Sequence, residues 1–389
     1  MIAYDWIAIG GGITGAALSY ELTKKGFSVL LLEQQANPQN ASHYNYGGLA
    51  YWSGTNELTR QLCQEGMEIH RFLSEELNID TEFREVNLLL TIDADENPQK
   101  IASYYSQFAI PPQLLTAKEA CHMEPLLNSA VISGALTVRH GHINPELVTR
   151  GYCQAMQQKG GIVQFEKVLE LVRQNQRIVG VKTASETYYG QNIVVCAGGF
   201  SRQLLKASGI SLPLYFTHAE LIEISAVDIQ LNTLVMPAQL KRFQLEKQAS
   251  KSENDRLWDE PGHEPVPPIL DAGAVQFKNG TIRLGQISRV LTDPDAKIDA
   301  KISESAIRDA VGKLLPSLAN LPGTWHHCLV AFSQNSLPIV GTIPDVEGVH
   351  IFSSFTNPLV FVPPLARRFA NQVSGVEDPI IERLNKLIG

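Results

Sequence analysis

The chain has 389 residues, of which 44% are hydrophobic and 19% charged, as is typical of a folded globular protein and not of a disordered or fibrous one. Its net charge of −8, without a lysine or arginine cluster, argues against a nucleic-acid partner. No apolar run approaches the roughly 18 residues of a transmembrane helix, so no membrane-spanning segment is expected.

The first predicted unit is a strand, a glycine-rich turn and a helix. A short apolar run over residues 6–9 leads directly into a turn with glycines at Gly10, Gly12 and Gly15. This spacing allows a tight turn, a close approach of a pyrophosphate to the backbone, and close packing of the helix on the sheet. Apolar residues then recur at helical spacing over 13–25, which predicts the helix.

A second strand and an acidic residue complete this unit. Gly26 is placed as a residue that ends a helix, and residues 27–32 predict a buried parallel strand. Glu33 follows, where its carboxylate can accept hydrogen bonds from both ribose hydroxyls of a dinucleotide. The alternative is an ordinary glycine-rich turn, in which the position of Glu33 would be chance. We therefore predict dinucleotide binding.

The segment after Glu33 indicates which dinucleotide is bound. A polar stretch over 34–45 precedes Gly47, where a nicotinamide-dependent dehydrogenase would continue its nucleotide-binding fold. The acidic strand end also disfavours the 2′-phosphate of NADP. FAD fits better, because a flavin enzyme needs a long loop to carry the ring away from the adenine end.

From this point the chain resembles the D-amino-acid oxidase superfamily of FAD-dependent oxidoreductases, in particular the branch of glycine oxidase and sarcosine oxidase. The similarity runs in family order to about Gly375. Beyond the opening unit it rests on Ser42-His43-Tyr44-Asn45-Tyr46-Gly47-Gly48, Gly141-His142-Ile143-Asn144-Pro145, Gly160-Gly161-Ile162-Val163 leading to Val168, Val194-Val195-Cys196-Ala197-Gly198-Gly199 and Leu337-Pro338-Ile339-Val340-Gly341.

The resemblance implies an FAD-binding site spread over the chain. The first loop would lie along the pyrophosphate and the flavin, and the backbone at Val168 would contact adenine. The residues expected to bind FAD are Gly10, Gly12, Ile13, Thr14, Gly15, Glu33, Gln34, Ser42, Asn45, Gly47, Gly48, Leu49, Val168, Ala197, Gly198, Gly341, Asn357, Leu359 and Val360.

The expected fold class is α/β, with a Rossmann-like FAD-binding domain and an inserted α+β substrate domain built on an antiparallel sheet. We assign 1–84, 140–210 and 324–389 to the first domain, and 85–139 and 211–323 to the second. The second pair carries strand-like patterns, and Asn279-Gly280 is a hairpin signal. The segment 238–268 is rich in Lys, Glu, Ser and Pro. It could be a lid over the site, but a solvated surface loop is the favoured interpretation.

The implied chemistry is hydride transfer from an amine-bearing carbon to flavin N5, followed by hydrolysis of the imine. It requires a cation for a substrate carboxylate and positive potential near the flavin. A helix with Pro363-Pro364 in its first turn is expected to supply that potential through its dipole.

The chain departs from the family at two places near the flavin. The family's carboxylate-binding arginine falls on Val330, and two glycines of the turn beside the flavin ring are replaced by Ser354 and Leu359. Other residues would then have to bind the substrate. The candidates are Arg283 and Arg289, then Lys278, with Tyr215 and His218 as hydrogen-bonding wall residues.

The predicted function is therefore oxidation of a C–N bond in an amine or amino acid, with FAD as cofactor and oxygen as acceptor. One alternative is a dehydrogenase that passes electrons to a quinone or carrier, and another is an FAD-binding protein with degraded catalysis. No metal site is expected. The five widely spaced cysteines and the strand beginning near residue 5 favour a reduced, cytoplasmic protein without a signal peptide. The identity of the substrate and the oligomeric state stay open.

Overall fold

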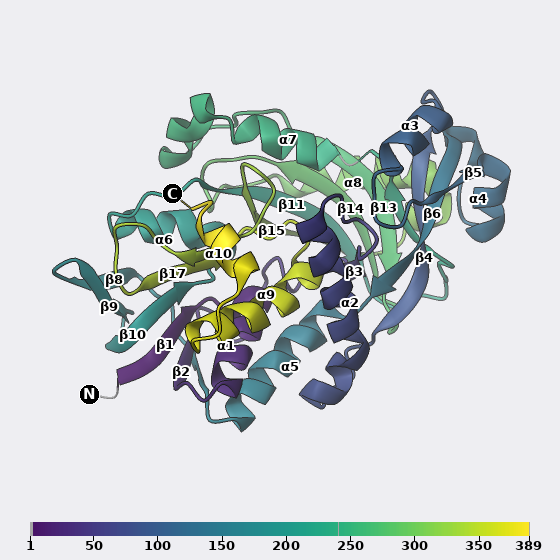
Figure 1. Cartoon of the computed structure of the whole chain (residues 1–389). Coiled ribbons are helices and arrows are strands. Elements are labelled where there is room, and N and C mark those ends of the chain that lie inside the picture. Colours follow the sequence, from purple (N-terminus) through teal and green to yellow (C-terminus); the bar gives the residue numbers. More distant parts are fainter. Residues whose placement is uncertain (1–2, 240, 389) are drawn as a thin grey trace.

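The computed structural model describes residues 3–239 and 241–388, which form two sheets with helices packed around them (Figure 1). The first sheet has the strand order β16-β17-β10-β1-β2-β7, with β8 and β9 attached beside β10. β17, β10, β1, β2 and β7 run parallel. The bounds are β1 (Ala3–Ile9), β2 (Val29–Glu33), β7 (Ile162–Phe165), β8 (Glu170–Gln174), β9 (Arg177–Lys182), β10 (Thr187–Val195), β16 (Ile339–Thr342) and β17 (Val349–Ser353).

The second sheet has the order β15-β11-β14-β13-β12-β4-β6-β3, with β5 on β6. Its pairs are antiparallel except for β12 with β4. The predicted hairpin around Asn279-Gly280 is confirmed as β13 and β14. The bounds are β3 (Gly48–Leu49), β4 (Arg84–Asp93), β5 (Gln113–Thr116), β6 (Ile132–His142), β11 (Leu214–Ile224), β12 (Leu234–Pro237), β13 (Ile269–Gln276), β14 (Ile282–Arg289) and β15 (Thr324–Ser333).

The fold class agrees with the sequence-based expectation, and the strand pairing adds detail to it. β3 and β15 belong to the second sheet, although both fall in segments that we assigned to the FAD-binding domain. The domain boundaries therefore stay a proposal.

Helices α1 (Ile13–Lys24), α2 (Glu57–Leu77), α5 (Pro145–Gln158) and α9 (Pro358–Val373) lie together on one side of the first sheet (Figure 1) and enclose its main hydrophobic core. In residues 3–239 and 241–388 no helix combines the length and hydropathy needed to cross a membrane. The other helices are α3 (Pro98–Tyr105), α4 (Ala117–Met123), α6 (Ser201–Ala207), α7 (Lys241–Ala249), α8 (Ala300–Leu314), α10 (Pro379–Asn385) and the 3-10 turns η1 (Ser129–Val131), η2 (Gly198–Phe200), η3 (Ser252–Asp259) and η4 (Pro316–Leu318).

The predicted strand, turn and helix at the start of the chain are confirmed as β1 and α1. A Cβ atom on Gly10 would lie 2.6 Å from the carbonyl oxygen of Cys196, and its φ of +104° favours glycine. A Cβ atom on Gly15 would lie only 1.9 Å from the carbonyl oxygen of Gly10. Glycine is therefore required at both positions by the turn itself, before any ligand is considered.

Two local expectations were wrong. The helix near Pro363-Pro364 begins earlier, at Pro358, so these two prolines lie inside α9 and not in its first turn. The favoured interpretation of 238–268 as a solvated loop fails for α7 and η3, because Leu245 and Trp258 are buried there in a common cluster. The alternative interpretation of this segment as a lid over the site is a hypothesis about its motion.

We expect the protein to lose stability in mild acid, because several of its histidines are buried. Burial lowers the pKa of His70 and of His218 to about 4, and that of His140 to about 3. An unfolded histidine has a pKa of about 6.5, so the unfolded state binds more protons below that pH. The free energy of unfolding should have its full value above pH 6.5 and should decrease as the pH falls from about 6.5 to 4. Urea midpoints at about pH 7.5 and 5 test this. His70→Gln should reduce the difference between them, and His263→Gln, at a side chain that is 41% exposed, should not.

Candidate active site

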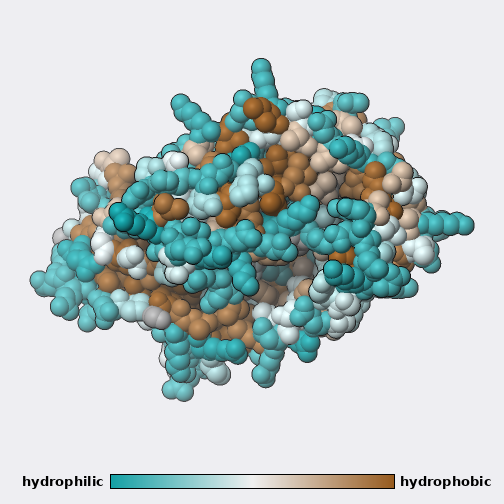
Figure 2. Space-filling view, turned by 90° about the horizontal axis from the view of Figure 1, so that it is seen from above, coloured by the Kyte–Doolittle hydropathy of each residue, from teal (hydrophilic) through white to brown (hydrophobic). Residues whose placement is uncertain are grey.

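A cavity of about 780 Å³ is lined by elements of both sheets. It begins at the glycine turn with Ile13 and Thr14, passes the loop that contains Ser42, and reaches the start of α9 and strand β11. Seen from above, the surface is hollowed near its centre and hydrophobic residues are exposed around that hollow (Figure 2). The cavity therefore connects the predicted nucleotide-binding turn with the predicted substrate sheet.

Two helices that begin at this cavity receive no capping hydrogen bond from their own N-cap residues. The N-cap residues are Gly12 in α1 and Asn357 in α9, and neither makes a side-chain capping hydrogen bond. The first turns of both helices also lack an acidic residue. By contrast, α2 and α5 are capped by the side chains of Asn56 and Asn144. Uncapped N–H groups and the positive end of the helix dipole suit anionic or electron-rich ligand groups.

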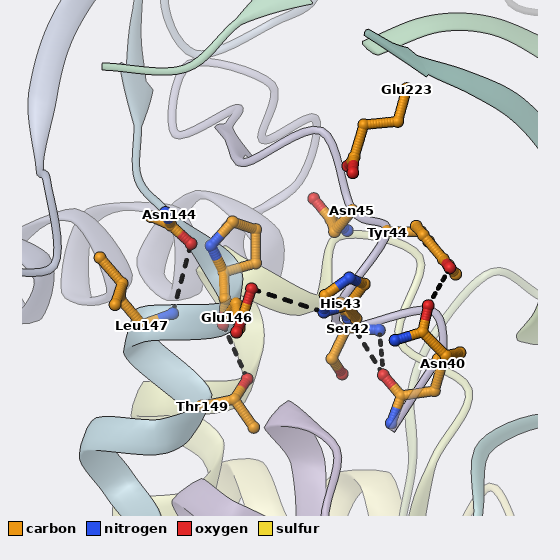
Figure 3. A network of polar contacts seen from close by, with 12 residues as sticks. Asn40, Ser42, His43, Tyr44, Asn45, Asn144, Glu146, Leu147, Thr149 and Glu223 are labelled. Carbon is orange, nitrogen blue, oxygen red and sulfur yellow. Dashed lines mark hydrogen bonds and ion pairs between the residues drawn. The ribbon is translucent and has the colours of Figure 1, made fainter. Parts of the chain in front are cut away.

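The loop after β2 folds over the start of α1. Asn40 Oδ1 accepts hydrogen bonds of 3.0 Å from the backbone N–H groups of Ser42 and His43. Ser42 Oγ accepts a hydrogen bond of 2.8 Å from the N–H of Ile13. His43 Nδ1 lies 3.5 Å from Glu146 Oε2 on α5 (Figure 3). These contacts place the hydroxyl of Ser42 at the end of α1 where a pyrophosphate is expected.

Glu33 is buried at the carboxyl end of β2. Its Oε2 atom accepts a hydrogen bond of 2.6 Å from Gly11 N, and its Oε1 atom accepts one of 3.1 Å from Gln35 N. Glu33 pairs with Phe165 at the end of the neighbouring strand β7. The half-buried Val168 follows in the next connection, so both predicted adenosine contacts come from adjacent strand ends.

We expect Glu33→Ala to weaken FAD binding by roughly 1–3 kcal/mol, because the ribose hydroxyls lose a charged acceptor. Titration of the apoprotein with FAD, followed by flavin fluorescence, measures the change. Glu253→Ala is the control, since the Glu253 side chain is 73% exposed. Equal dissociation constants for Glu33→Ala and the control would remove Glu33 from the site.

The other expected FAD-binding residues divide into two groups. Gly341 packs against α10, since a Cβ atom there would lie 2.0 Å from Asn385 Oδ1. Within the described residues, the expected cofactor contacts that line the cavity are Ile13, Thr14, Ser42, Asn45, Gly48, Gly198, Asn357 and Leu359. Those outside its lining are Gly10, Gly12, Gly15, Glu33, Gln34, Gly47, Leu49, Val168, Ala197, Gly341 and Val360.

Arg283 lines the cavity, but its Nε and Nη1 atoms already donate to protein groups. Its Nε atom donates to Glu223 Oε2 at 2.8 Å, and its Nη1 atom donates to the carbonyl oxygens of His43 and Asn45. Only 8% of its side chain is exposed. Arg283 therefore fastens the loop around His43 and Asn45 to the second sheet, and its charge is paired with that of Glu223.

Arg289 lies on the other side of the second sheet because β14 contains a bulge. Arg283 and Arg289 are six residues apart and would share a face in a regular strand. The pairing with β11 shifts by one residue, which leaves Gln286 without a partner and reverses the alternation beyond it. Arg289 pairs instead with Glu220 at 3.2 Å and with an exposed glutamate, Glu264.

Tyr215 and His218 also lie outside the cavity lining in the described chain. The hydroxyl of Tyr215 donates to Asp255 Oδ1 at 2.9 Å, and Nε2 of His218 lies 3.1 Å from the carbonyl oxygen of Asp293. On β11 it is Ala219 and Leu221 that line the cavity, so His218 points to the opposite face. The structure does not bring these two predicted wall residues to the site.

Arg242 on α7 is the cavity cation that the sequence-based reasoning missed. Its Nε atom lies 3.5 Å from Glu246 Oε1, and its backbone N–H donates to Asp271 Oδ2. Among residues 3–239 and 241–388, no hydrogen bond is found for its two Nη atoms. Apart from Arg242, the charged residues that line the cavity are Asp271 and Arg283, and both are engaged. The apolar spacing of Leu245 and Ala249 was the signal for a packed helix here.

Three hydroxyl groups at the cavity have no hydrogen-bond partner in the described residues. They belong to Tyr46, Ser353 and Ser354, and each oxygen is buried. Burial raises the pKa of Tyr46, so its hydroxyl stays protonated and can donate. Ser354 has a φ of +63°, so this serine adopts a left-handed conformation that favours glycine. Such unpartnered groups fit a cavity that receives a polar ligand.

The remaining lining is largely apolar. Val330 and Ala331 line the cavity from β15, so the family's arginine position presents no charge there. An aromatic group, Trp52, Tyr105 and Phe108, lines another part of it and packs as one cluster. Within the described residues, Arg242 is thus the cavity cation whose two Nη atoms make no hydrogen bond, and it lies in a mostly apolar wall.

Comparisons with known proteins agree with this fold. The chain is 24% identical over 401 residues to glycine oxidase of Pseudomonas aeruginosa, covering 97% of this chain and 96% of that protein. It is 23% identical over 396 residues to an uncharacterized oxidoreductase of Bacillus subtilis, covering 95% of each. The crystal structure of glycine oxidase from Geobacillus kaustophilus matches with a TM-score of 0.79 and 20% identity, covering 97% and 96% of the two chains. Residues 5–372 match the DAO family described as FAD dependent oxidoreductase, and the chain belongs to this family.

Proposed function

We propose that the chain oxidises a C–N bond of an amine or amino acid in this cavity and that water then hydrolyses the imine. The observation that carries the proposal is a single cavity that joins the starts of α1 and α9 to the apolar part of the second sheet. FAD, when bound, accepts the hydride at its N5 atom.

The residues present suit the different parts of the cofactor. The backbone at Thr14 and the hydroxyl of Ser42, which the N–H of Ile13 holds in place, would bind the pyrophosphate, and Glu33 would bind the ribose. The start of α9 would face the flavin, where its partial positive charge favours the reduced form. The residues expected from the sequence to bind FAD are therefore proposed as its binding site.

At the substrate end, we assign the carboxylate-binding role to Arg242 and the hydroxyl of Tyr46. Arg242 has donors to spare, and Tyr46 is a neutral donor without a partner in the described chain. The aromatic group around Trp52 would contact an apolar body of the substrate. The substrate class is therefore an amine that carries a carboxylate. The earlier candidates Arg283, Arg289, Tyr215 and His218 have other partners.

The site must also bind the amine in its neutral form, since hydride transfer requires the lone pair of the nitrogen. Asp271 accepts two backbone N–H groups, and burial lowers the pKa of His140 to about 3, so neither is a free base. Arg242, Arg283 and the two helix N-termini disfavour an additional positive charge in the cavity. The site therefore selects the neutral amine by electrostatic repulsion of the ammonium form.

Aerobic turnover with a panel of carboxylated and simple amines tests the function. We expect peroxide and a carbonyl product in equal amounts, because oxygen is the proposed acceptor. A carbonyl product without peroxide, formed only when a quinone is added, would show a dehydrogenase instead. No product with any member of the panel, from FAD-loaded protein, would favour a flavoprotein with degraded catalysis.

A further inference from the structure

Two consecutive prolines inside α9 create a defect next to the cavity. In a regular helix the N–H of each residue donates to the carbonyl oxygen four residues earlier. Pro363 and Pro364 have no N–H, so the carbonyl oxygens of Leu359 and Val360 lose their helical donors. Both carbonyls belong to the first turn of α9, where Leu359 lines the cavity.

Helix α2 covers this defect with two residues on one of its faces. His70 is 1% exposed, and its Nε2 atom lies 2.6 Å from the carbonyl oxygen of Leu359. Gly66 lies one turn earlier on α2, and a Cβ atom there would lie 2.1 Å from the carbonyl oxygen of Val360. The side chain of His70 thus replaces one missing donor, and the absence of a side chain at Gly66 leaves room for the carbonyl of Val360.

The chemistry of His70 defines its role. A carbonyl oxygen only accepts, so Nε2 must carry the proton and donate. In the neutral ring Nδ1 then carries none, and this buried atom has no partner within the described residues. Burial lowers the pKa of His70 to about 4, so the ring is neutral at physiological pH.

We propose that His70 is a positioning residue that fixes the first turn of α9 toward the flavin by donating its Nε2 proton to the carbonyl oxygen of Leu359. The inference rests on the proposed placement of the flavin at the start of α9. A firmly held helix start keeps its partial positive charge directed at the flavin, and this favours the reduced, negatively charged state. His70 would therefore raise the midpoint potential of the flavin without touching cofactor or substrate.

The test is the midpoint potential of FAD-loaded variants, measured by reduction with dithionite in the presence of a reference dye. We expect His70→Leu to lower the potential by about 30 mV, which is a tenfold change in the equilibrium constant of a two-electron couple. His70→Gln should restore most of it, because its amide N–H can donate at a similar reach. No substrate is involved, so the result stands even if the protein oxidises no amine.

Two further variants separate positioning from general destabilisation. Leu73→Ala removes a buried side chain of α2 that is 1% exposed, and it should lower the melting temperature without changing the potential. Gly66→Ala should lower the potential, because the added methyl group displaces the carbonyl of Val360. If His70→Leu does not fold, Gly66→Ala against Leu73→Ala decides. A wild-type potential in folded His70→Leu would overturn the proposal; if that variant does not fold, a wild-type potential in Gly66→Ala would do so. The proposal also fails if Leu73→Ala shifts the potential as much as these variants do. A folded His70→Gln with the same potential as His70→Leu would equally contradict it.

Discussion

Gly12→Val should yield a folded protein that does not retain FAD. Gly12 has a φ of −67° and a ψ of −178°, a conformation that valine adopts freely. A Cβ atom there would meet Ser42 Oγ at 3.0 Å and then Asn40 Nδ2 at 3.8 Å, so small shifts accommodate it in the apoprotein. The branched methyl groups, however, occupy the space between the glycine turn and its covering loop, where the pyrophosphate is expected.

The measurement is the ratio of flavin absorbance to protein absorbance after purification, beside circular dichroism to confirm folding. Gly262→Val is the matched control, because a Cβ atom at Gly262 would meet nothing within 4 Å and its φ of +95° imposes backbone strain. The control should carry FAD despite any loss of stability. Stoichiometric FAD in folded Gly12→Val would remove the pyrophosphate from this turn.

Arg242→Ala should raise the KM for a carboxylated amine by tenfold or more, which corresponds to about 1.4 kcal/mol of binding free energy. The substituted protein loses the free guanidinium of the cavity, and a substrate carboxylate then enters an apolar site without a partner. The same change should have little effect on an amine of similar shape without a carboxylate. FAD content should stay constant, since the ion-pair and hydrogen-bond partners of Arg242, Glu246 and Asp271, are not among the proposed cofactor residues.

Steady-state kinetics on the paired substrates measure this prediction, with Arg256→Ala as control because its side chain is 91% exposed. Tyr46→Phe should show a smaller effect of the same kind, since it removes a neutral donor. Equal changes of KM for both substrates would mean that Arg242 shapes the cavity without binding a carboxylate. An unchanged KM would exclude the assigned clamp.

Sequence patterns predicted the nucleotide-binding half of the molecule well, because its geometry is local. Gly10 and Gly15 are required by close backbone approaches, and the strand ends at Glu33 follow from short apolar runs. The hairpin at Asn279-Gly280 is likewise a property of adjacent residues. These features are fixed within a few residues of sequence.

The substrate end was predicted less well, because it depends on strand pairing and on the packing of one helix. A single unpaired residue in β14, Gln286, turns Arg289 away from the face of Arg283. The polar composition of 238–268 concealed a packed helix that carries Arg242 into the cavity. Pro363 suggested a helix start, but α9 begins five residues earlier, and His70 on another helix lies at hydrogen-bond distance from a carbonyl that the prolines leave without a donor.

Anaerobic mixing of the FAD-loaded protein with a carboxylated amine tests the central claim most directly. We expect the oxidised flavin absorbance to bleach within a single turnover, with a rate that rises with pH as the substrate amine loses its proton. The bleached protein should recover its colour when oxygen is admitted. Flavin that stays oxidised with every amine of the panel, yet is reduced normally by dithionite, would contradict the assignment of C–N oxidation to this cavity.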